Sequence, residues 1–152
     1  MLAAATVRRF GIEPKAALLP HSDFGSSNRA PARRMREAVA LIRRLDPGME
    51  VEGEMHAGSA LSEENRDQVM GPTELSGQAN LLVMPSLDAA NITYNALKEL
   101  TDGESVGPML LGLRRPAHIL QESVSTRGIL DMTAVAVVDA QINGATELPF
   151  DK

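Results

Sequence analysis

The sequence predicts an α/β fold in which a layered, mostly parallel sheet is flanked by helices. Short apolar runs alternate along the chain with segments whose apolar residues recur at helical spacing, as strands and helices do in this class. The chain has 152 residues, which is enough for one domain with a real core. Its apolar fraction of 43% is too high for a disordered chain.

The first expected elements are a strand, a helix and a second strand. Residues 15–20 form a short apolar run typical of a buried strand. After Pro31, Met35, Val39 and Ile42 share one face of a helix, which Asp46-Pro47-Gly48 ends. Residues 49–56 alternate loosely and predict a second strand.

The middle of the chain repeats this alternation. Residues 61–70 have helical spacing and stop at Gly71-Pro72, and residues 80–84 predict a third strand that Pro85 breaks. A helix is expected over residues 88–100, with Asp88 as its N-cap because the carboxylate can accept a free amide of the first turn.

The last third predicts two further elements. A turn at Asp102-Gly103 precedes a fourth strand over residues 106–113. Residues 132–139 are rich in β-branched side chains, which favour a strand, whereas Ser125 is suited to capping a helix. We expect a buried helix of about fifteen residues here. The expected layout is a lead-in at 1–14, the lobe at 15–142 and a tail at 143–152.

Composition excludes several function classes. The net charge of −5 argues against a general binder of nucleic acid or of anionic membranes. The absence of cysteine excludes disulfides, thiolate metal sites and a cysteine nucleophile. No run approaches the length of a membrane span, and the basic pair Arg8-Arg9 follows the first apolar residues, which reverses the order of a secretory signal. We therefore expect a cytoplasmic protein.

A polar loop supplies most of the candidate ligand-binding residues. Residues 21–28 lie between the first strand and its helix, where ligands bind in parallel sheets. Gly25 allows close approach of the backbone, and nearby side chains supply hydrogen-bonding groups for a phosphate or carboxylate. The alternative is a polar turn that caps the helix. The candidates here are His21, Ser22, Gly25, Ser26 and Ser27.

Two further candidates follow the third strand. Asp88 and Asn91 lie three residues apart, so both can face the edge where the strands end. The three histidines, at positions 21, 56 and 118, match no metal motif, and we interpret them as structural, with His21 the best functional candidate. We expect no metal site in this chain.

Three alternating glutamates mark the second strand. Glu50, Glu52 and Glu54 point to one face, and we interpret them as a solvated edge of the sheet.

Six segments taken together resemble the phosphate acetyl/butyryltransferase family. They are HSDFGSS (21–27), ARRMREA (32–38), VEGEMH (51–56), ANLLVMPSLDAANI (79–92), VGPMLLG (106–112) and ILDMTAVAVVDA (129–140). The sequences of these segments are most similar to the C-terminal domain of bacterial NADP-dependent malic enzymes of the large, two-part type. The resemblance covers nearly all of residues 5–142.

The resemblance implies a fold and a longer protein. It implies an isocitrate/isopropylmalate dehydrogenase-like lobe, the C-terminal half of a two-lobed unit with an acyl-CoA and phosphate cleft between its lobes. It also implies an upstream malic enzyme domain that carries the NADP and divalent-metal sites. We accordingly expect the chain to be a piece of a longer protein or a truncated gene product.

The chain departs from the family where the transfer chemistry resides. Active relatives resemble one another at a Ser-Arg-Gly segment and a following Asp, which align here with residues 121–123 and with Gly128. Glu122 replaces the arginine and inverts the local charge, and loss of the Asp removes a candidate base. Gly58 stands where relatives usually have an acidic residue.

Three functions remain open from the sequence. The first is a catalytically silent regulatory module that responds to acetyl-CoA and helps to assemble a homo-oligomer. The second is an active phosphate acyltransferase that moves an acetyl group between CoA and phosphate. The third is a purely structural module that holds subunits together. The partners of the chain would be an acyl-CoA and the upstream domain, with no nucleic acid and no membrane.

Overall fold

The chain divides into two compact units, Met1–Ala96 and Leu97–Lys152. The computed structural model describes residues 1–101, 105–113, 115–122 and 124–145. The turn expected at Asp102-Gly103, Ser123 of the aligned catalytic segment and the end of the expected tail lie outside the described residues. Each unit is described by itself.

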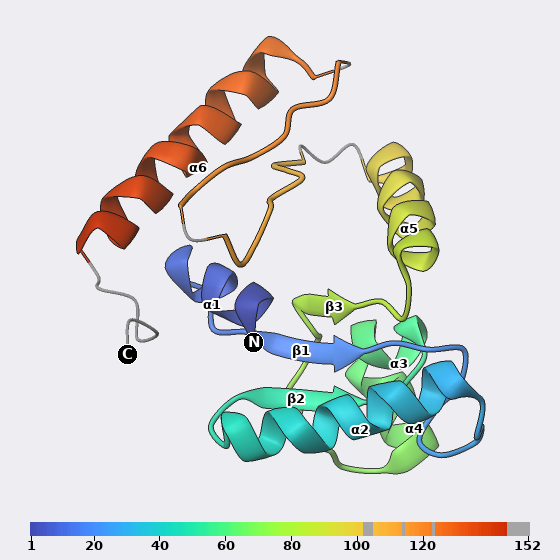
Figure 1. Cartoon of the computed structure of the whole chain (residues 1–152). Helices are drawn as coiled ribbons and strands as arrows, with labels where there is room; N and C mark the ends of the chain where they lie inside the picture. Colours follow the sequence, from blue (N-terminus) through green and yellow to red (C-terminus); the bar gives the residue numbers. More distant parts are fainter. Residues whose placement is uncertain (102–104, 114, 123, 146–152) are drawn as a thin grey trace. The chain divides into compact units, whose positions relative to one another are not determined.

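The first unit is built on a three-stranded parallel sheet in the order β2-β1-β3 (Figure 1). Ala16 of β1 is in register with Val51 of β2 and with Leu81 of β3. The elements are α1 (Leu2–Arg9), β1 (Lys15–Leu18), α2 (Ala30–Leu45), β2 (Glu50–Gly53), α3 (Ala57–Leu61), α4 (Glu63–Met70), β3 (Leu81–Val83) and α5 (Leu87–Leu100), which continues into the second unit. The predicted α/β class and the first three strands are confirmed.

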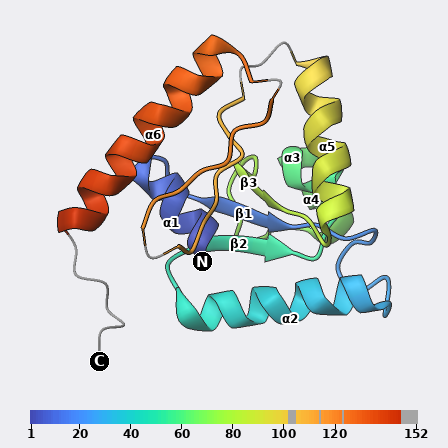
Figure 2. The ribbon, with the colours of Figure 1, turned by 45° about the horizontal axis from the view of Figure 1, so that its top comes forward.

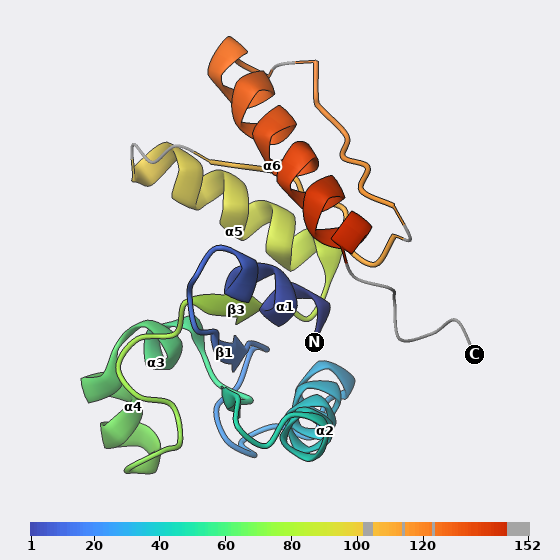
Figure 3. The same ribbon diagram turned by 90° about the vertical axis from the view of Figure 1, so that its left-hand side faces the viewer.

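Both faces of the sheet are covered, because the side chains of β1 alternate between two apolar clusters. Ala16 and Leu18 pack with Met35 and Val39 of α2 on one face. Ala17 packs on the other face with residues of α3 and of the segment that leads to β3. Figure 3 shows α2 on one side of the strands and α3 with α4 on the other. Short apolar strands therefore suffice here, since helices exclude water from both sides.

The expected solvated edge of glutamates is wrong. β2 does lie at an edge of this sheet, but Glu52 and Glu54 are buried. Arg43 Nη2 lies 3.1 Å from Glu52 Oε1, and Arg36 Nη1 lies 2.5 Å from Glu54 Oε1. The two arginines are two turns apart on α2, so they lie on the same side of that helix, which runs along β2 (Figure 2). A buried charge needs such a partner, and the sequence pattern did not reveal the pairing.

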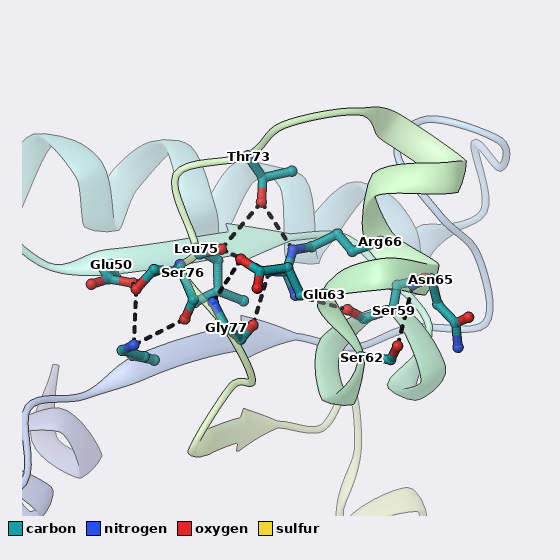
Figure 4. Close-up of polar contacts among 11 residues, drawn as sticks. Glu50, Ser59, Ser62, Glu63, Asn65, Arg66, Thr73, Leu75, Ser76 and Gly77 are labelled. Carbon is teal, nitrogen blue, oxygen red and sulfur yellow. Dashed lines mark hydrogen bonds and ion pairs between the residues drawn. The ribbon is translucent and has the colours of Figure 1, made fainter.

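Polar contacts hold the segment before β3 against α3 and α4 (Figure 4). The fully buried Arg66 donates to Thr73 Oγ1 and to the carbonyl oxygens of Ser59, Leu75 and Gly77. Each of its three nitrogens donates at least one hydrogen bond, so its guanidinium joins α3, α4 and the incoming chain. These contacts explain why a charged residue belongs to the core.

The second unit contains α6 (Thr126–Ala145) and the irregular segment that precedes it. The expected final helix is present and has 20 residues, and Ser125 Oγ accepts from the amide of Gly128 as predicted for its cap. The expectation that this helix is buried is wrong, because Met132 is buried whereas Ile129, Leu130, Val137 and Val138 are 45% to 62% exposed. Buried His118 accepts a hydrogen bond from the amide of Leu110 and lies 3.4 Å from Asp139, which is the environment of a structural histidine. No helix among the described residues is long and apolar enough to cross a bilayer.

The fourth strand expected at residues 106–113 is wrong. The described residues of this segment form no strand. Gly107 adopts a φ of +150°, and Pro108 has no amide to donate to a ladder. The apolar side chains of Leu110, Leu111 and Leu113 are exposed instead of buried in a sheet. Residues 106–113 are apolar, but among the described residues no strand pairs with them.

A side chain at position 53 should destabilise the protein strongly. Gly53 has a φ of +143°, and a Cβ there would lie 2.7 Å from the carbonyl oxygen of Leu18 on the neighbouring strand. We expect Gly53→Ala to lower the free energy of unfolding by more than about 2 kcal/mol in urea denaturation. The control is Gly58→Ala, because a Cβ at this helical position meets nothing within 4 Å. Equal stability of the two variants would contradict the prediction.

The acid limb of the stability curve should depend on Glu50. Hydrogen bonds from the amide and hydroxyl of Ser76, and then the charge of Lys15, lower the pKa of Glu50 below its ordinary 4.5. A lowered folded-state pKa contributes stability that is present above the unfolded value and is lost as the pH falls through the folded one.

We therefore expect Glu50→Gln to flatten the fall in unfolding free energy below about pH 4.5. Ser76→Ala keeps the backbone donor and removes the hydroxyl, so its curve should lie between those of Glu50→Gln and the wild type. Chemical denaturation at several pH values measures this, and identical acid limbs in all three proteins would count against the role of Glu50.

Candidate functional site

The segments that follow β1, β2 and β3 meet at one edge of the parallel sheet in the first unit. The three arrows point the same way in Figure 1, so their carboxyl ends lie together. Residues 19–29 follow β1, residues 54–56 follow β2, and residues 84–86 lead into α5. Ligands of open α/β sheets bind at this kind of edge. It is therefore the candidate site.

The loop after β1 is folded by its own side chains. Ser26 Oγ accepts from the amide of Asp23, and the amide of Ser26 returns a hydrogen bond to the Asp23 carbonyl. Ser27 Oγ lies 3.1 Å from His21 Nε2 and accepts from the amide of Arg29 before α2. The two serine hydroxyls thus stabilise a turn, which supports the polar-turn interpretation, while exposed side chains of the same loop face solvent.

A buried carboxylate ties this loop to the second strand and to α2. Glu54 is completely buried, and its Oε1 accepts from the amide of Gly25 at 3.0 Å and from Arg36. Arg36 also donates to the carbonyl oxygen of Ser27 and to Asn28 Oδ1. One ion pair therefore fixes both ends of the turn. Such a fixed loop holds its exposed groups in one geometry.

A second carboxylate at this edge holds a histidine. Asp23 Oδ2 lies 2.5 Å from His56 Nδ1, and Asp23 Oδ1 accepts from the amide of His56 at 2.6 Å and from Ser59 Oγ at 3.2 Å. Neither Asp23 nor His56 is among the ligand-binding residues predicted from the sequence. The sequence does place both residues directly after strands, in HSD after the first strand and in EMH after the second. Their contact could not be predicted from this, because it depends on the parallel pairing of the two strands.

The candidate ligand-binding residues of the loop after β1 differ in their exposure to solvent. His21, Gly25 and Ser26 are exposed and Ser27 is partly exposed, whereas Ser22 is buried. No described residue hydrogen-bonds the Ser22 hydroxyl. Its burial removes it from direct contact with a ligand in this conformation.

Asp88 and Asn91 lie in the first turns of α5 at the same edge, and both are exposed. The expected capping role of Asp88 is wrong, because α5 begins at Leu87 and Ser86 Oγ accepts from the amide of Ala89. Asn91 Oδ1 accepts from Asn95 Nδ2 one turn later. Asp88 is therefore not needed to cap the helix, and its carboxylate is available at the surface.

The edge also carries positive charge. Arg29, Arg33 and Arg34 are exposed at the start of α2, and Arg34 Nη1 lies 3.5 Å from the carbonyl oxygen of Pro85, which follows β3. With Glu54 compensated by Arg36, these guanidiniums suit an anionic ligand. No three side chains of the described ranges form a cluster that could hold a metal ion.

Glu122 and Gly128, which the family resemblance aligns with the catalytic residues of relatives, lie in the second unit. Glu122 is exposed in a turn, and Gly128 lies in the first turn of α6. A Cβ at position 128 would lie 2.8 Å from Val124 Cγ2 and 3.4 Å from Ser125 Oγ. Side chains of this segment therefore occupy the space that an aspartate at position 128 would need.

Comparison with known proteins identifies the matching family. The family model described as "Phosphate acetyl/butaryl transferase" matches residues 1–137. A solved phosphotransacetylase from Streptococcus pyogenes has a similar fold, with a TM-score of 0.84 and 29% sequence identity over 95% of this chain and 43% of its own. These matches confirm the resemblance expected from the sequence motifs.

Nearly the whole chain is similar in sequence to a part of several malic enzymes. An NAD-dependent malic enzyme from Rhizobium meliloti is 54% identical over 140 residues, which is 92% of this chain and 18% of that enzyme. An NADP-dependent malic enzyme from Salmonella typhimurium is 49% identical over 93% of this chain and 19% of its own length. The chain thus spans about a fifth of the length of these relatives.

Removing the cation beside Glu54 should destabilise the loop and the sheet together. We expect Arg36→Met to lower the unfolding free energy by about 3 kcal/mol, because it leaves a buried carboxylate without its partner. The double variant Arg36→Met, Glu54→Gln should recover much of this loss, since a neutral amide can still accept from Gly25. Arg44→Met, at an exposed position of the same helix, is the control. Urea denaturation that gave Arg36→Met and Arg44→Met equal stability would contradict the prediction.

Proposed function

Because this chain belongs to the phosphate acetyl/butaryl transferase family, we propose that it is a regulatory acyl-CoA-binding module of a malic enzyme and is silent as a transferase. Acetyl-CoA is the proposed effector. The malic enzyme reaction, with its NADP and divalent metal, is proposed for a separate domain of a longer, cytoplasmic and homo-oligomeric protein. The high identity to malic enzymes over nearly the whole chain supports this assignment.

One observation carries the proposal of catalytic silence. An exposed acid, Glu122, stands where the family resemblance expects an arginine, and an anionic phosphate would be repelled there. Gly128 supplies no carboxylate at the position of the expected base, and Val124 crowds the space for one. Loss of both groups removes the stabilising charge and the proton acceptor of the transfer reaction.

The carboxyl edge of the first unit supports ligand binding. Its loop is fixed by Glu54 and Arg36, so exposed groups such as His21 and Ser26 keep one geometry. A preorganised edge with exposed guanidiniums favours an anionic ligand over water, because little ordering remains to be done on binding. A bound acyl-CoA would regulate the attached enzyme if its affinity differs between two states of the protein.

The apolar surface of α5 supports the oligomerisation part of the proposal. Leu87, Ile92, Leu97 and Leu100 have between 45% and 81% of their surface exposed. Exposed apolar groups at this density on one helix are typical of a surface that a further protein segment covers. The same observation also supports the third function left open by the sequence, a purely structural module that holds subunits together.

The alternative function is an active phosphate acyltransferase that moves an acetyl group between CoA and phosphate. The ordered loop after β1 and the available carboxylate of Asp88 favour it. It requires another cation to replace the arginine that Glu122 has displaced.

Binding and turnover measurements on the full-length protein separate these functions. Calorimetry should detect acetyl-CoA binding with a Kd below about 1 mM, and acetyl-CoA should change the malate-dependent rate. Acetyl phosphate and CoA should yield no acetyl-CoA above background. Absence of binding would overturn the regulatory proposal, whereas acetyl-CoA formation that Asp88→Asn abolishes would establish the transferase.

A further inference from the structure

The Asp23–His56 pair joins the loop after β1 to the start of α3 and holds an exposed imidazole. His56 is at the surface, with about half of its side chain exposed, while Asp23 is largely buried. Asp23 Oδ2 lies 2.5 Å from Nδ1 of the imidazole, and Oδ1 is taken by the His56 amide and by Ser59. A carboxylate held by three donors fixes the orientation of the ring.

The position of Asp23 is set by the backbone that follows it. Phe24 has a φ of +39°, which is strained for a residue with a side chain, and its amide donates to the carbonyl oxygen of Glu54 at 2.8 Å. The next amide, of Gly25, donates to the Glu54 carboxylate. The strained residue is thus held between the anchored Asp23 and the buried Glu54. Strain that is over-determined in this way is typical of functional sites.

The contact with Asp23 decides which ring nitrogen carries the hydrogen. An ionised carboxylate only accepts, so in the neutral imidazole the hydrogen of His56 is on Nδ1 and Nε2 has the lone pair. No described residue hydrogen-bonds this Nε2. His21 differs because its Nε2 is engaged with Ser27 Oγ, and His118 differs because it is buried. Among the three histidines, His56 therefore presents an exposed, oriented proton acceptor at the carboxyl edge of β2.

We propose that the Asp23–His56 pair makes this site recognise a free thiol, so that the module distinguishes CoA from acetyl-CoA. This inference rests on the proposed function for the identity of the ligand. The thiol of CoA donates its hydrogen to Nε2. If the S–H bond breaks, the proton moves to Nε2 and leaves a thiolate beside an imidazolium that Asp23 stabilises. A thioester has no such hydrogen, so acetyl-CoA gains nothing from this contact.

The first test measures how fast the imidazole of His56 is acylated. Diethyl pyrocarbonate acylates the unprotonated nitrogen of accessible imidazoles, and peptide mass mapping of the full-length protein gives the rate at each histidine. We expect His56 to react faster than His21 and His118. CoA should protect His56 more than acetyl-CoA does. A rate at His56 no greater than that at buried His118 would overturn the inference.

The second test measures ligand discrimination. We expect His56→Gln to weaken CoA binding about tenfold, because the hydrogen bond from the CoA thiol to Nε2 is lost. The acetyl-CoA affinity of the same variant should stay within about twofold and serves as the internal control for folding. Asp23→Asn should weaken CoA binding in the same direction, since the amide no longer stabilises the imidazolium.

The outcomes separate this inference from the proposed function. If both ligands bind and His56→Gln leaves the affinity for CoA unchanged, the inference is wrong and the regulatory module stands. An equal loss for both ligands would also overturn it, because His56 would then be a general binding or structural residue. If neither ligand binds to the wild-type protein, the proposed function fails and the recognition of CoA fails with it.

Discussion

The buried carboxylate of Glu54 is the interaction on which the site depends. It lies where the second strand ends, and it accepts from Gly25 in the loop after the first strand and from Arg36 of α2. Burying this charge is unfavourable unless the partners are in place. Strand end, loop and helix are therefore ordered together, and the Asp23–His56 pair is held by the same backbone contacts.

The two edges of the sheet have different roles because their polar groups are used differently. At the amino-terminal edge, Glu50 accepts from Ser76, and beside the sheet Arg66 donates to internal carbonyl oxygens of α3 and of the segment before β3. At the carboxyl edge, Arg36 and Asp23 fix the backbone, while His56 and Arg29 keep exposed polar groups. A rigid base with outward-facing donors and acceptors is the arrangement that binding sites in parallel sheets require.

Local signals in the sequence predicted the elements that depend on few distant contacts. Periodicity predicted β1 and α2, and the Ser125 cap predicted the start of α6. The apolar run at 106–113 predicted a strand that the structure lacks, because strand formation needs a neighbour with free donors and acceptors. Ser86, one residue before α5, caps this helix in place of Asp88. The sequence pattern did not distinguish the two residues, because it defines the ends of a helix only to within one or two positions.

The sequence by itself determined the α/β class, the family and most of the candidate residues at the carboxyl edge, because these follow from local periodicity and from motifs read in order. Only the tertiary structure decided that Glu52 and Glu54 are buried ion-pair partners and that Asp23 orients His56. The physical reason is distance along the chain. The partners of a buried charge come from other elements, and parallel pairing of strands brings them together only in the folded protein.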